Sequence, residues 1–133
     1  MGVNKQFDSK RYKKAIDFSY SFYQYKFRKG LKIPYFTYLS SVSNLIIENN
    51  GNTDEAIAGL LHDLLEFDSN KKKTNIVKSR FGIKVLNIIK QCSNTNYTDL
   101  KNQDWISSKK KFLETMNKKS QSTLLVSICD KLH

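Results

Sequence analysis

Two residues that can take part in acid–base or metal chemistry, His62 and Asp63, stand side by side in an apolar segment. Leucines at positions 60, 61, 64 and 65 flank the pair, so the spacing predicts that it lies buried within a helix. A buried carboxylate is costly unless it is paired or binds a metal ion. From this dipeptide alone, a His–Asp hydrogen bond in the core, or a helix turned so that the pair meets solvent, is favoured over a metal site.

A third residue of this kind, Asp130, interrupts another apolar segment farther along the chain. Taken alone, it is expected to pair with Lys131 or to mark a helix end. One imidazole and two carboxylates together form a hard, oxygen-rich set, which suits Mn²⁺, Fe²⁺ or Mg²⁺ better than a structural Zn²⁺. His62, Asp63 and Asp130 are therefore the candidate metal ligands.

The elements that must position these residues are expected to be helices, because apolar residues recur at three- and four-residue steps. Pro34, Thr53, Asp104 and Ser120 predict helix starts, and Gly82 predicts a helix end. The predicted helices cover 8–28, 34 to about 49, a stretch from 53, about 74–81, a stretch around 85–89, and stretches from 104 and from 120.

These helices are expected to share one core. The inward-facing residues include Tyr25 in the first helix and Ile128 and Leu132 in the last. Residues 71–73 and 92–103 are expected to form loops. Without repeats or a linker, the pattern predicts a compact all-α domain of six or seven helices spanning 1–133.

The charge of the chain is strongly basic but uneven. The 133 residues carry a formal net charge of +11, yet residues 33–70 contain six acids and no lysine or arginine. A hydrophobic content of 39% excludes a disordered basic tail, and the basic flanks favour a small polyanion as ligand. No apolar run predicts a signal peptide or a membrane span, and no membrane is expected among the partners. Cys92 and Cys129 predict reduced thiols in a cytoplasmic protein, with a disulfide as the weaker alternative.

The motifs resemble those of the HD phosphohydrolase superfamily, and in particular the small alarmone hydrolases related to the hydrolase half of RelA/SpoT enzymes. The resemblance rests first on His62-Asp63 followed far downstream by Asp130. It extends from about residue 12 to the last residue through the segments 15–18, 27–30, 33–35, 60–66, 81–85, 92–95, Trp105 with Lys109 and Lys110, and 129–133.

The resemblance implies an HD-type helical fold and, in active members, one Mn²⁺ held by two His and two Asp. Such members hydrolyse the 3′-pyrophosphate of guanosine tetraphosphate (ppGpp). By this resemblance His62, Asp63 and Asp130 correspond to metal ligands, and Glu66 to the acid beside the attacking water. The positions implied for binding substrate are Arg28, Asn94, Lys109, Lys110 and Lys131.

Several positions depart from the family pattern. Tyr38 stands where the first metal-binding His is expected, and Tyr23 replaces an earlier His. The acid expected after Glu66 is Phe67, with Asp68 one place late. Asn94 replaces a usual Asp. Relatives also continue beyond His133, so the C-terminal end is expected to be shortened.

Three functional interpretations follow. The favoured one is an inactive relative that still binds a phosphorylated nucleotide or a protein partner, because a tyrosine at position 38 binds such an ion poorly. The alternative is an active Mn²⁺-dependent hydrolase of ppGpp or a similar nucleotide. The third, ranked lowest, is a nucleic-acid binder that uses the basic flanks and four interleaved aromatic residues, although a helix core is favoured for those rings. They are Tyr20, Tyr23, Tyr25 and Phe27.

Overall fold

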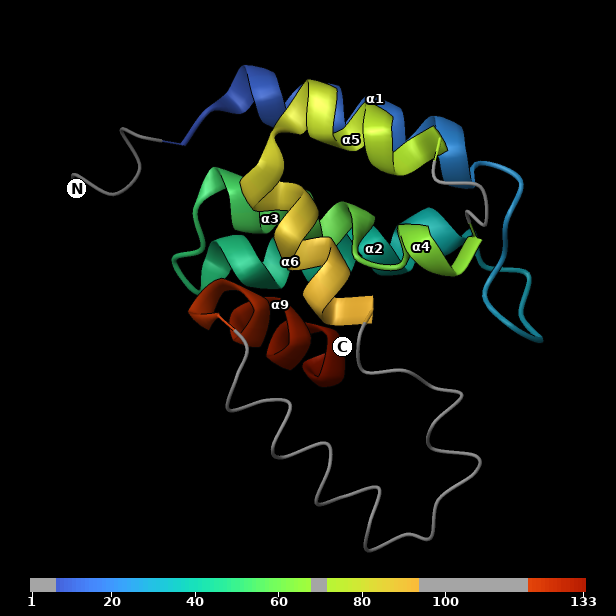
Figure 1. Cartoon of the computed structure of the whole chain (residues 1–133). Helices are drawn as coiled ribbons and strands as arrows, with labels where there is room; N and C mark the ends of the chain where they lie inside the picture. The colour runs from blue at the N-terminus through green and yellow to red at the C-terminus, as the bar shows by residue number, and fades with distance from the viewer. Residues whose placement is uncertain (1–6, 68–71, 94–119) are drawn as a thin grey trace, which may run out of the picture.

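A computed structural model describes residues 7–67, 72–93 and 120–133, and within these ranges the chain is helical (Figure 1). The helices are α1 (Ser9–Tyr23), α2 (Tyr35–Glu48), α3 (Thr53–Leu61), α4 (Leu64–Phe67), α5 (Lys72–Phe81), α6 (Ile83–Ser93) and α9 (Gln121–Leu132). The all-α prediction is therefore confirmed. The helix predicted to start at Asp104 lies outside the described residues.

Local sequence explains where the helices begin. Asp8 caps α1 by accepting a hydrogen bond from the Arg11 amide, at 3.1 Å. Asn52, not the predicted Thr53, caps α3 in a reciprocal capping box with Glu55. The Thr53 hydroxyl instead accepts from the Asp8 amide at 2.8 Å, which fixes the start of α1 against the start of α3.

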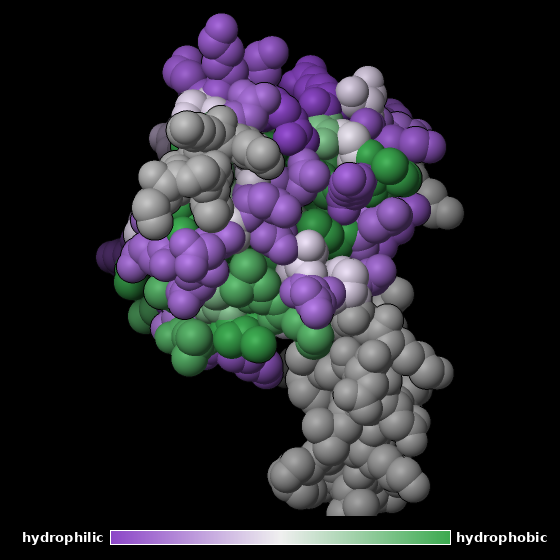
Figure 2. Space-filling view, turned by 90° about the vertical axis from the view of Figure 1, so that its left-hand side faces the viewer, coloured by the Kyte–Doolittle hydropathy of each residue, from purple (hydrophilic) through white to green (hydrophobic). Residues whose placement is uncertain are grey.

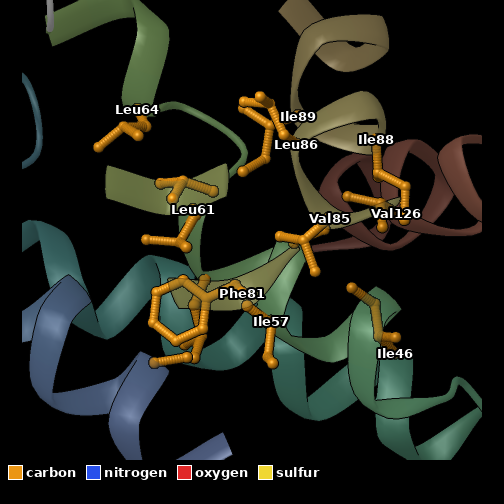
Figure 3. Packing of buried hydrophobic residues seen from close by; sticks show 14 of the residues in the cluster. Ile46, Ile57, Leu61, Leu64, Phe81, Val85, Leu86, Ile88, Ile89 and Val126 are labelled. Carbon is orange, nitrogen blue, oxygen red and sulfur yellow. The ribbon is translucent and has the colours of Figure 1, made fainter. Parts of the chain in front are cut away.

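Helix α3 lies at the centre of the fold and packs against α1, α2, α6 and α9. Seven of its nine residues are buried. Figure 3 shows its Ile57 and Leu61 beside apolar side chains of α5 and α6, in a cluster that also includes Val126 of α9. A helix buried on nearly every side fixes the position of whatever follows its last turn, which here is the His62-Asp63 pair.

The last helix turns a different face inward than the sequence predicts. Thr123, Val126 and Cys129 are buried at three-residue steps, where α9 contacts α2, α3 and α6. The predicted core residues Ile128 and Leu132 fall off this stripe and are 51% and 69% exposed. That prediction was wrong because polar Thr123, bonded through its hydroxyl to the Gln91 side chain at 2.6 Å, occupies the inward face.

Three predicted boundaries also change, one of them because α6 extends to Ser93, inside the predicted 92–103 loop. Helix α1 ends at Tyr23 rather than near 28, and Tyr25 is 85% exposed instead of buried. Helix α5 begins at Lys72, so part of the predicted 71–73 loop is helical. Gly82 follows α5 with a φ of 99°, a left-handed conformation that confirms its predicted role as a helix end.

The surface at the top of Figure 2 is mainly hydrophilic. Helices α1 and α5 carry exposed lysines, among them Lys10, Lys14 and Lys78. Hydrophobic residues gather lower on the same face. Among the described residues, no helix has the length and apolar character needed to cross a membrane.

Candidate metal and nucleotide site

The His62-Asp63 pair lies at a break between α3 and α4, not inside one continuous helix as the sequence predicts. His62 is only 5% exposed, and its Nδ1 lies 2.8 Å from the carbonyl oxygen of Gly59 in the last turn of α3. The carbonyl of Asp63 accepts from the Glu66 amide at 3.0 Å, which starts the short α4. Because Nδ1 of His62 contacts the Gly59 carbonyl, Nε2 is the ring nitrogen that faces the rest of the site.

Helix α9 brings Asp130 to the same place. Nε2 of His62 lies 3.3 Å from Oδ1 of Asp63 and 3.6 Å from Oδ1 of Asp130. The structure therefore brings together the three residues that the sequence singled out as candidate ligands. Their assignment as metal ligands stays a prediction.

Two tyrosines of α2, Tyr35 and Tyr38, join His62, Asp63 and Asp130 in one hydrogen-bonded cluster. The hydroxyl of Tyr38 lies 3.1 Å from Nε2 of His62 and donates a hydrogen bond to Oδ1 of Asp130. One helical turn earlier, the hydroxyl of Tyr35 donates to Oδ2 of Asp63 at 2.5 Å. Both carboxylates are thus hydrogen-bonded to phenols of the same helix.

The electrostatics of the cluster keep these phenols protonated. Burial, together with the negative charges of Asp63 and Asp130, raises the pKa of Tyr38 well above its ordinary value. Burial and Asp63 likewise raise the pKa of Tyr35. Burial alone would lower the pKa of His62, but Asp130 and Asp63 outweigh it and raise that pKa to about 9. These shifts favour the protonated forms of both phenols and of the His62 imidazole.

The residues present do not fit a resident Mn²⁺ in this arrangement. A ligand must offer a lone pair to the cation, whereas the Tyr38 phenol donates its proton to one of the carboxylates that would bind it. Among the described residues, no group of three or more His, Cys, Asp and Glu side chains is arranged to hold a metal ion. The mismatch arises where the resemblance expects a histidine and the chain has Tyr38.

The other predicted site residues divide between those near the cluster and those that cannot be placed. The Arg28 guanidinium lies over the Tyr38 ring, with Cζ 5.1 Å from the ring centroid. Glu66 and Lys131 are both exposed. Burial and the charge of Asp63 raise the pKa of Glu66. Asn94, Lys109 and Lys110 lie outside the described residues.

The replaced positions Tyr23 and Phe67 form an aromatic wall beside the cluster. The Tyr23 ring stacks on Tyr35, with centroids 5.4 Å apart, and Phe67 meets both rings edge-on. Tyr23 is fully buried, and within the described residues its hydroxyl is the buried side-chain polar atom that has no hydrogen-bond partner. Sequence reasoning gave Tyr35 no role. Its position one turn before Tyr38 on an apolar helix is the signal that could have identified it.

The fold and the site define an all-α domain in which a His–Asp pair after one helix meets an aspartate from a distant helix. The chain belongs to the HD domain family, whose model matches residues 15–133. The resemblance of the motifs to the HD superfamily is therefore confirmed.

Comparison with solved structures finds a similar fold in a metazoan ortholog of SpoT that hydrolyzes ppGpp and plays a role in starvation responses. The TM-score is 0.73 at 22% sequence identity, and the match covers 95% of this chain and 68% of that one. No curated protein sequence matches the chain.

Proposed function

We propose that this HD domain binds a phosphorylated guanosine nucleotide, or a similar small polyanion, and does not hydrolyse it by the metal-dependent route. One observation carries the proposal: the Tyr38 hydroxyl joins His62 and Asp130 through hydrogen bonds. His62, Asp63 and Asp130 thus lie close together, and the hydroxyls of Tyr35 and Tyr38 donate hydrogen bonds to the two carboxylates.

The loss of hydrolysis follows from the donor chemistry. A bound dication would lower the pKa of a water molecule and stabilise charge on a phosphoryl oxygen. The neutral Tyr38 phenol does neither, and it donates its proton to one of the two carboxylate oxygens of Asp130. Loss of a single ligand is severe, since even outer-shell changes typically reduce metal affinity 10- to 100-fold.

Retained binding is supported by cations beside the cluster. Arg28, at the position that the family resemblance assigns to the nucleotide, extends its planar guanidinium over Tyr38 and is only partly buried. Such a group can stack on a base or form paired hydrogen bonds with a phosphate. The solved structure with a similar fold comes from a protein that hydrolyzes ppGpp, which makes this nucleotide the first ligand to test.

The active Mn²⁺-dependent hydrolase remains the second candidate, because His62 lies within 3.6 Å of both carboxylates. For that function the Tyr38 hydroxyl would have to leave Asp130. The two candidates differ in the need for metal, and that difference can be measured.

The test is titration calorimetry of the full chain with ppGpp, in EDTA and then in Mn²⁺, with chromatography of the nucleotide after incubation. We expect binding in EDTA and an unchanged nucleotide in Mn²⁺. Arg28→Ala should weaken binding about tenfold, the effect of losing one charge-assisted contact. Lys29→Ala, which removes an exposed charge at the next position, should not. Turnover at several per second would establish the second candidate, and absence of binding in both conditions would overturn both.

A further inference from the structure

The connection between α1 and α2, residues 24–34, forms a hairpin that projects from the helical body, in light blue at the right of Figure 1. The Arg28 amide donates to the Ile33 carbonyl, and the Tyr35 amide to the Lys26 carbonyl, each at 2.9 Å. Phe27 and Pro34 pair as an antiparallel bridge. Gly30, with a φ of 74°, makes the turn between them.

The first arm of this hairpin has its cations on the inside. Successive side chains of an extended segment point to opposite faces. Lys26 places its Nζ 5.2 Å from the centroids of both Phe22 and Phe67, and Arg28 lies over Tyr38. The neighbouring aromatic residues point to the outside: Tyr25, just before Lys26, is 85% exposed, and Phe27, between the two cations, is 56% exposed.

This arrangement overturns the expectation that these rings belong to a helix core. A surface segment normally buries its rings and leaves its cations in water. Tyr23 alone of the aromatic series is buried, whereas Tyr20, Tyr25 and Phe27 are all more than half exposed. The two cations, Lys26 and Arg28, contact aromatic rings of the helices. Within the part of the chain that the structure describes, the apolar face of the hairpin is left largely exposed.

The second arm adds to the same kind of surface. Leu31 is 51% exposed and Ile33 is 43% exposed, with exposed Lys32 between them and exposed Lys29 just before the turn. Across residues 25–33 the chain has four basic residues and no acidic one. The hairpin therefore combines exposed apolar groups with an uncompensated positive charge.

We infer that this hairpin docks on the surface of an anionic lipid bilayer. Tyrosine and phenylalanine settle at the interface between headgroups and acyl chains, and aliphatic side chains reach below it. Lysines at the same level are attracted to anionic headgroups. An anionic bilayer would thus cover the four exposed apolar residues of the hairpin and attract its two exposed lysines.

A single-stranded nucleic acid is the competing partner for an aromatic and basic surface. Its bases would stack on rings such as Tyr25 and Phe27, with phosphates near Lys29 and Lys32. Stacking would leave the aliphatic side chains of Leu31 and Ile33 exposed, whereas a bilayer covers them. The observations therefore favour lipid, and nucleic acid becomes an outcome of the test.

The experiment is flotation of the full chain with vesicles of phosphatidylcholine alone and of phosphatidylcholine with an equal amount of phosphatidylglycerol. We expect flotation with the anionic vesicles only, and a decrease as salt increases. Phe27→Ser combined with Leu31→Ser should abolish it at unchanged circular dichroism. Ile128→Ser combined with Leu132→Ser, which removes two equally exposed apolar residues of α9, should leave it unchanged.

The charge contribution is tested separately. Lys29→Gln with Lys32→Gln should reduce the floated fraction several-fold, and Lys10→Gln with Lys14→Gln on α1 should change it much less. If both lysine pairs act alike and the Phe27/Leu31 variant still floats, binding is general electrostatic attraction and the proposal fails. It also fails if no vesicle is bound, or if fluorescence anisotropy shows tight binding of a single-stranded oligonucleotide while the vesicles remain free.

Discussion

The hydroxyl of Tyr38 donates a hydrogen bond to the carboxylate of Asp130, a residue 92 positions later in the chain. The same hydroxyl lies 3.1 Å from Nε2 of His62. This hydroxyl thus links α2, which carries Tyr38, with α9, which carries Asp130. The link stabilises the arrangement without a cation, because both carboxylates have hydroxyl donors.

The first prediction concerns the position of Tyr38. Tyr38→His should increase Mn²⁺ affinity at least tenfold, because an imidazole offers a lone pair where the phenol donates a proton. Titration calorimetry with MnCl₂ alone measures this. Tyr38→Phe is the control, since it removes the hydroxyl without adding a ligand and should gain much less. Equal affinities in Tyr38→His and Tyr38→Phe would show that the missing ligand is not at position 38.

The second prediction concerns the buried hydroxyl of Tyr23. Tyr23→Phe should leave the free energy of unfolding unchanged or raise it by up to about 1 kcal/mol, because an unpaired buried hydroxyl costs desolvation without a compensating bond. Tyr12→Phe is the matched control: it loses a 2.6 Å hydrogen bond to Ser43 and should cost about 1 kcal/mol. Urea unfolding compares them, and equal losses would mean that the Tyr23 hydroxyl has a partner.

The third prediction concerns Gly59, where α3 approaches α2 closely. A Cβ here would lie 2.5 Å from Cδ1 of Ile46 and 3.3 Å from Cα of Ser43. Gly59→Ala should therefore destabilise the fold by about 1–3 kcal/mol, despite the higher helix propensity of alanine. Adding Ile46→Val, which removes the clashing methyl, should recover part of the loss in a double-mutant cycle. A thermal melt in which Gly59→Ala is more stable would contradict the close approach.

The fourth prediction concerns Arg11, which joins three helices. Its Nη2 donates to Oδ1 of Asp54 and to the carbonyl of Phe81, each at 2.8 Å. Arg11→Met should lower the free energy of unfolding by about 1–2 kcal/mol, because the Phe81 carbonyl at the end of α5 loses its donor. Lys13→Met removes only an exposed pair with Asp17 and should cost under about 0.5 kcal/mol. Chemical denaturation at moderate salt separates the two, and equal costs would make the Arg11 contacts unimportant.

The sequence by itself determined the helical class and the main site residues. Period-3.6 spacing requires helices, and caps such as Ser120 and Gly82 acted where predicted, because these signals operate within a few residues. His62, Asp63 and Asp130 could also be singled out, since acids and an imidazole in apolar segments need partners.

Only the tertiary structure decided which partners those residues have. The contacts of His62, Asp130 and Tyr38 join the end of α3, α9 and α2, and no local pattern states which faces of these elements meet. The same limit explains the errors at Ile128 and Tyr25: periodicity identifies apolar residues, but packing on α3 and the hairpin turn determined which were covered. Local sequence determined the elements, and the long-range packing of side chains determined that the Tyr38 hydroxyl contacts both His62 and Asp130.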